Sequence, residues 1–120
     1  MGLDMMLYKE VSQEPVEIGY WRKVNAIHGW IVNNLADGVD ECQRIPMTAD
    51  NMRELLGLCK RVMKTKSRKT AQAILPTTPG FFFGGDDYDE WYFRGIEHTI
   101  KILEEALEEP NGTFFYRASW

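Results

Sequence analysis

Cysteine and histidine are scarce in this sequence, which has two of each among its 120 residues. Cys42 and Cys59 form neither a CxxC motif nor a zinc-ligand spacing, so we expect two reduced, unpaired thiols. No apolar run is long enough to cross a membrane, and the N-terminus lacks the pattern of a secretory signal. These absences predict a cytoplasmic protein with no membrane partner, no bound metal and no cofactor.

Basic residues are also fewer than acidic residues. The net charge is −4 and the pI is about 5.2, which argues against non-specific binding to long nucleic acid. The charges are unevenly distributed, because residues 55–85 contain no acid and six bases, whereas residues 86–109 contain nine acids and two bases. We expect these two segments to neutralise each other across the fold or to lie on solvated faces.

Two kinds of apolar periodicity follow one another in the first third of the chain. Alternation of apolar and polar residues predicts a strand over 3–8 and, after a loop over 10–15, a second short strand over 16–20. Apolar residues at helical spacing then begin at Trp21. This first helix is expected to end at Asp37-Gly38, a pair that favours a helix stop and a turn.

The rest of the sequence mainly favours helices. Thr48 is a good N-cap for a second helix, residues 67–75 suggest a short third helix, and a long helix extends to about Glu109. Residues 113–120 are typical of a final strand. We therefore predict a single domain over residues 1–120 of the α+β class, in which a small, mainly antiparallel sheet packs against about three helices.

Aromatic residues, glycines and acids follow one another between residues 80 and 90. The run Phe81–Phe83 is expected to form a strand, with Phe82 pointing opposite to its two neighbours. Gly84-Gly85 before a helix resembles a phosphate-binding turn, but no G-K-[ST] sequence follows, which excludes a P-loop. The four acids of residues 86–90 would oppose a phosphate there, and they fit helix capping better than a divalent-cation site.

The densest cluster of polar and aromatic side chains lies at the start of the first predicted helix. Its members are the candidate ligand-binding residues Tyr20, Trp21, Arg22, Lys23, Asn25 and His28. Helical steps of four and three would put Trp21, Asn25 and His28 on one side. An aromatic plane, an amide, an imidazole and a guanidinium together suit a base and a phosphate. The alternative is structural: a helix that packs its Trp and His onto the sheet and leaves Arg22 and Lys23 in solvent.

Four sequence segments carry a resemblance to a group of small uncharacterised proteins of bacteriophages and prophages. The segments are Gly2-Leu3-Asp4-Met5-Met6-Leu7-Tyr8-Lys9, Gly19-Tyr20-Trp21-Arg22-Lys23 with Asn25, Ile27 and His28, Gly80-Phe81-Phe82-Phe83-Gly84, and Ser119-Trp120. Met6 stands where a Tyr is expected in relatives. The resemblance implies a phage accessory protein that acts in the cytoplasm of a bacterial host, where such proteins inhibit host enzymes or blunt host defence.

Three functions remain open from the sequence. The leading hypothesis is a non-enzymatic protein that counters host defence by sequestering a small, planar, anionic, nucleotide-derived ligand at the cluster of residues 20–28. The second is an inhibitor of a basic, nucleic-acid-binding host protein, which would use the acids at the end of the last helix. The third is an enzyme with His28 or His98 as its acid–base group. The oligomeric state is also open, and a homo-oligomer is one alternative.

Overall fold

The computed structural model describes residues 2–78, 80 and 84–120, and it has the predicted α+β architecture. The elements in chain order are β1 (Asp4–Val11), β2 (Glu14–Arg22), α1 (Asn25–Leu35), β3 (Ile45–Met47), α2 (Ala49–Thr65), α3 (Arg68–Ile74), α4 (Glu90–Ala106) and β4 (Phe114–Ser119). The described residues form four helices rather than about three. The segment Phe81–Phe83 lies outside the described residues, so the orientation of Phe82 stays a prediction.

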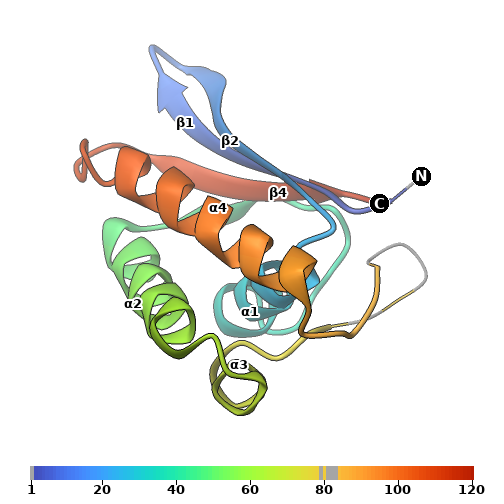
Figure 1. Ribbon diagram of the computed structural model, residues 1–120. Helices are drawn as coiled ribbons and strands as arrows, with labels where there is room; N and C mark the ends of the chain where they lie inside the picture. The colour runs from blue at the N-terminus through green and yellow to red at the C-terminus, as the bar shows by residue number, and fades with distance from the viewer. Residues whose placement is uncertain (1, 79, 81–83) are drawn as a thin grey trace.

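The four strands form one sheet in the order β2-β1-β4-β3, and every pair is antiparallel. Figure 1 shows that the helices lie on one side of this sheet. Alternation along β1 determines which side chains face the helices: Met5 and Leu7 are fully buried, whereas Met6 and Tyr8, which alternate with them, are half-buried. None of the helices in the described part of the chain is long and apolar enough to span a membrane.

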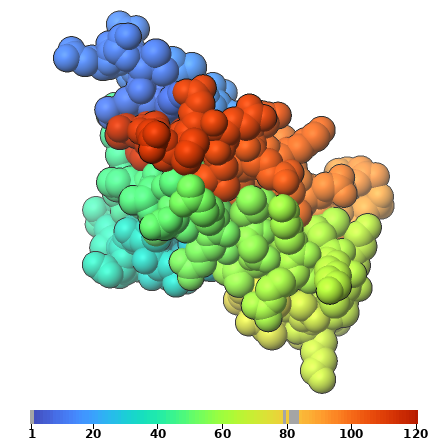
Figure 2. Space-filling model, turned by 90° about the vertical axis from the view of Figure 1, so that its left-hand side faces the viewer, coloured from blue at the N-terminus to red at the C-terminus, as the bar shows by residue number. Residues whose placement is uncertain are grey.

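The β1–β2 hairpin is longer than predicted, and its tip protrudes from the body of the protein (Figures 1 and 2). The predicted loop over 10–15 is wrong, because only Ser12 and Gln13 separate the strands. Both residues have positive φ, at 51° and 70°, which is the pattern of the tight turns that fit the twist of two paired strands. Pro15 follows on β2, an edge strand, where a missing backbone N–H is tolerated.

The first helix begins four residues later than predicted, at Asn25 instead of Trp21. Trp21 belongs to β2, where it pairs with Met5. The backbone of Lys23 explains the boundary. Its N–H donates to the carbonyl of Leu3 at 2.7 Å, and its φ of 56° is left-handed, which a right-handed helix does not accept. Trp21, Asn25 and His28 therefore do not share a helix face.

Two other predicted helix boundaries are confirmed. Thr48 caps α2, since its side chain accepts from the N–H of Asn51 while the Asn51 side chain accepts from the N–H of Thr48. After α1, Gly38 has a φ of 82° and donates its N–H to the carbonyl of Val32 at 2.9 Å, which closes the helix.

Helix α4 lies close to the β2 end of the sheet. A Cβ atom added to Gly19 of β2 would lie 2.4 Å from Cγ2 of Ile102, and one added to Gly95 would lie 2.9 Å from Cγ1 of Val24. Helix α2 packs on the other side of α4, where Lys60 forms an ion pair with Glu104 at 3.3 Å. Among the described residues, it is the one ion pair that joins the basic segment 55–85 to the acidic segment 86–109.

Candidate functional site

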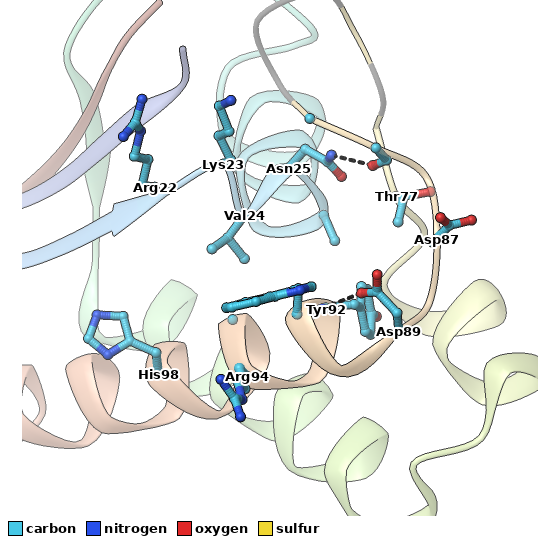
Figure 3. A pocket seen from close by; sticks show the side chains of 15 residues that line it. Arg22, Lys23, Val24, Asn25, Thr77, Asp87, Asp89, Tyr92, Arg94 and His98 are labelled. Carbon is cyan, nitrogen blue, oxygen red and sulfur yellow. Dashed lines mark hydrogen bonds between the residues drawn. The ribbon is translucent and has the colours of Figure 1, made fainter.

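A cleft of about 540 Å³ lies between the β2–α1 junction, the loop 84–89 and the first turns of α4 (Figure 3). Its lining combines charged, amide and aromatic side chains. They include Arg22, Lys23, Asn25, Asp87, Trp91, Arg94 and His98. Volumes of this size are typical of sites that enclose a small molecule. The β2–α1 junction was the centre of the predicted cluster, whereas the α4 side was not part of it.

Hydrogen bonds hold the walls of the cleft in place. Asn25 is only 4% exposed, and its amide donates to the carbonyl of Gly85 at 2.8 Å and accepts from the N–H of Thr78 at 2.9 Å. The hydroxyl of Tyr88 accepts from the N–H of Thr77 at 3.1 Å. Because these bonds join the start of α1 to two separate parts of the chain, the loop 84–89 is fixed against the β2–α1 junction.

Two cationic side chains converge beside Gly2. A Cβ atom added there would lie 3.4 Å from Nη2 of Arg22, and 3.0 and 3.8 Å from Cε and Nζ of Lys23. In Figure 3 the side chains of Arg22 and Lys23 both point away from α4. The side chain of the next residue, Val24, points toward α4. Gly2 is buried, and its lack of a side chain lets Lys23 and Arg22 pack closely against its backbone.

The two cations are unevenly neutralised. Nε of Arg22 lies 3.9 Å from a carboxylate oxygen of Asp4, and the Asp4 carboxylate also accepts a hydrogen bond from the hydroxyl of Tyr20. Among the described residues, no carboxylate lies within ion-pair distance of the Lys23 ammonium. Like charges held this close repel each other, so an anion between them would be stabilised.

The α4 wall of the cleft carries an exposed indole. Trp91 is 74% exposed, although the guanidinium of Arg94 lies 5.2 Å from its ring centroid. Arg94 also forms an ion pair with Glu90, and it points away from Lys23 in Figure 3. One turn further on, Nε2 of His98 donates to the carbonyl oxygen of Tyr20 at 2.7 Å, which ties α4 to the edge of β2.

Carboxylates occupy the loop side of the cleft. Asp87 is exposed there, and Asp89 caps α4 by accepting from the N–H of Tyr92 at 3.1 Å. The capping interpretation of these acids is thus confirmed for Asp89. In the described residues, no three His, Cys, Asp or Glu side chains are grouped so that they could hold a metal ion.

The structure separates the six predicted ligand-binding residues into two groups. Arg22, Lys23 and Asn25 line the cleft, whereas Tyr20, Trp21 and His28 do not. Tyr20 is 45% exposed outside it, and the hydrogen bond to Asp4 raises the pKa of its phenol because the carboxylate favours the protonated form.

Trp21 and His28 belong to the core, as the structural alternative predicted. Nε1 of Trp21 donates to Oγ1 of Thr99 at 2.7 Å. His28 lies between Tyr116 and Asp40, with Nδ1 2.7 Å from the Tyr116 hydroxyl and Nε2 2.9 Å from a carboxylate oxygen of Asp40. Burial raises the pKa of Tyr116, so its hydroxyl stays protonated and can serve as the donor to His28.

Sequence reasoning missed the contribution of Trp91. The apolar stripe of α4 contains Tyr92, Ile96 and Leu103, which are all buried. Trp91 lies one residue out of phase with that stripe, so helical periodicity alone would have placed its indole in solvent. Gly2 gave no such signal, because its closeness to Arg22 and Lys23 depends on the pairing of β1 with β2.

Comparisons of this chain with protein-family models, with curated proteins and with solved structures gave no match.

Proposed function

We propose that this protein is a non-enzymatic binding protein that holds a small, planar, anionic ligand such as a nucleotide in the cleft. The observation that carries the proposal is the presence of an exposed indole and an unneutralised lysine in the lining of the same 540 Å³ cleft. Stacking of a base on an aromatic side chain contributes about 1–3 kcal/mol. Arg22 and Lys23, which point away from α4 in Figure 3, would turn toward the cleft and hold the anionic group with charge-assisted hydrogen bonds.

Binding fits this cleft better than catalysis. His28, one of the two predicted acid–base groups, is 1% exposed, does not line the cleft, and has both ring nitrogens bonded within the fold. His98 lines the cleft, but its Nε2 is already bonded to the carbonyl of Tyr20. An enzyme would need a base within hydrogen-bond reach of a reacting group. The resemblance to phage proteins extends the proposal to a role: sequestration of a nucleotide signal in an infected bacterium.

The inhibitor hypothesis has less support. Of the four acids at the end of α4 and just after it, Glu104 is paired with Lys60 and Glu109 with Lys9. Internal partners of this kind reduce the charge that the surface can offer to a basic protein. The acidic surface therefore has a role within the fold that needs no partner.

The proposal is tested by calorimetric titration with AMP and with GMP, alongside native mass spectrometry of freshly purified protein. We expect measurable binding, and about a tenfold or greater loss of affinity in Trp91→Ala, because a stacking surface is removed. Tyr20→Ala is the matched control: it removes an exposed aromatic ring outside the cleft and should leave affinity unchanged. Absence of binding to the wild type, or equal effects of the two variants, would contradict the proposal.

A further inference from the structure

We infer that the face of the sheet opposite the helices binds single-stranded nucleic acid, with a base stacked on Tyr8 and the phosphates held by Arg44 and Arg117. None of these residues lines the cleft, so the inference goes beyond the proposed function. In the described part of the chain the helices lie on the other side of the sheet, which leaves this face open (Figure 1).

The strand register determines which side chains share the open face. Met6 and Tyr8 of β1 alternate with the buried residues of that strand, so they project away from the helices. Their partners on β4, Arg117 and Phe115, project to the same side. Arg44, the residue before β3, joins them, because its guanidinium carbon lies 4.6 Å from the centroid of the Phe115 ring.

Three of these side chains form one continuous stack. The rings of Tyr8 and Phe115 are nearly parallel, with centroids 4.9 Å apart and an interplanar angle of 18°. Because β4 lies between β1 and β3, Arg44 meets Phe115 from the side opposite Tyr8. Phe115 is only 6% exposed, whereas Tyr8 is half-buried and has no second ring contact among the described residues. Tyr8 therefore has ring surface available to a base, and stacking of a base contributes about 1–3 kcal/mol.

Arg44 and Arg117 are two exposed cations without a carboxylate partner. The register that pairs Ile45 with Tyr116 next places Arg44 beside Arg117. Neither arginine forms an ion pair among the described residues, and Nε of Arg117 donates to the carbonyl of Cys42 at 3.1 Å. Like charges opposite each other on neighbouring strands destabilise a sheet. A phosphate between these guanidinium groups would relieve the repulsion and accept charge-assisted hydrogen bonds.

Charge and area favour a nucleic acid strand over a protein as the occupant. Asp4 and Glu17 are on the β1–β2 half of the open face, which leaves the β4–β3 half positive. Four strands ~4.8 Å apart and the six residues of β4 at ~3.3 Å each give a face of roughly 300–400 Å². A stable protein interface buries about 800 Å² on each partner, so a second copy of this chain would gain too little contact here. A single strand needs only a stacking ring and a few phosphate contacts.

The test is fluorescence anisotropy with labelled oligouridine and oligoadenosine strands of about 12 nucleotides. At ~50 mM salt we expect the wild type to bind with a Kd of about 10–100 μM. Two phosphate contacts predict that the logarithm of the association constant falls with the logarithm of salt concentration with a slope of about −1.4. Arg44→Ala and Arg117→Ala should each weaken binding about fivefold or more and reduce the slope to about −0.7. Tyr8→Ala should weaken binding by a similar factor and leave the slope unchanged, because it removes stacking and no charge.

Arg61→Ala is the matched control for the arginine variants. Arg61 is an exposed arginine of α2, on the helix side of the sheet, and it has no ion pair among the described residues. Its removal changes the net charge by the same amount and should leave both the affinity and the slope unchanged. Trp91→Ala, which alters the cleft, should also leave oligonucleotide binding unchanged.

The outcomes separate this face from the cleft. If the wild type binds neither strand, or if Arg117→Ala and Arg61→Ala have equal effects, the inference is overturned while the proposed nucleotide cleft stands. If a 12-nucleotide strand binds no more tightly than a duplex of about the same length, or than an oligoglutamate peptide, the face is not a single-strand site. Loss of oligonucleotide binding in Trp91→Ala would place the strand in the cleft and would also overturn the inference.

Discussion

At the scale of single residues, His28 in the core and Arg22 at the cleft differ in how fully their polar atoms are bonded within the fold. His28 is enclosed by Tyr116 and Asp40, and in the described residues no buried side-chain polar atom lacks a hydrogen-bond partner. The Arg22 side chain is 58% exposed and has one distant carboxylate neighbour. Buried polar groups are costly to leave unpaired, whereas an exposed ion pair contributes only about 0–1 kcal/mol.

This contrast gives a prediction about stability. His28→Ala should lower the free energy of unfolding by at least about 2 kcal/mol, because it leaves the Tyr116 hydroxyl buried without its partner and opens a cavity. Arg22→Ala should lower it by less than about 1 kcal/mol. Urea denaturation of the two variants measures both values. Equal losses would show that Arg22 has a structural role that the described contacts do not reveal.

At the scale of secondary structure elements, the close approach of α4 to the β2–α1 junction shapes the cleft. Gly95 makes this approach possible, since an added Cβ would lie 2.9 Å from Cγ1 and 3.0 Å from Cγ2 of Val24. Gly57 lies inside α2 and has no atom within 4 Å of its added Cβ. The two glycines are both inside helices, so they differ mainly in what surrounds them.

We therefore predict opposite signs for the same substitution. Gly57→Ala should stabilise the protein by up to about 1 kcal/mol, as expected from the helix propensity of alanine. Gly95→Ala should destabilise it by about 1–3 kcal/mol, because overpacking outweighs the gain in propensity. Thermal or urea unfolding distinguishes the two. A stabilising Gly95→Ala would mean that α4 can move away from Val24 at little cost.

The sequence was sufficient to predict most elements, because their signals are local. The caps at Thr48 and Gly38 depend on side chains and backbone angles within a few residues. The start of α1 could not be predicted in the same way: Trp21 fits helical spacing with later residues as well as strand alternation with Gly19. Pairing with Met5 decides between these alternatives, and that contact is made with a distant part of the chain.

The same limit applied to the candidate site. Arg22, Lys23 and Asn25 were found because they are adjacent in sequence. Their separation from Trp21 and His28, and their meeting with Gly2 and Trp91, follow from strand pairing and from the packing of α4.

At the scale of the whole molecule, the core and the cleft respond to different conditions. The core contains three acidic groups whose pKa values burial raises: the thiol of Cys59, to about 12, and the phenols of Tyr92 and Tyr116. Each is easier to deprotonate in the unfolded chain, whose pKa values are near 9 for cysteine and 10 for tyrosine. Folding is therefore linked to pH in the alkaline range.

The sign of this linkage predicts alkaline instability. Below pH ~9 all three groups are protonated in both the folded and the unfolded state, so the free energy of unfolding has its full value. Above pH ~9 the unfolded state loses protons that the folded state keeps, so the free energy of unfolding falls. For Cys59 the loss should be about 1 kcal/mol by pH ~10 and should continue toward its folded pKa of about 12. Urea denaturation at pH ~8 and ~10 measures the loss, and Cys59→Ala should reduce its size by removing one titrating group. Equal stability of the wild type at the two pH values would mean that these groups titrate alike in the folded and unfolded states.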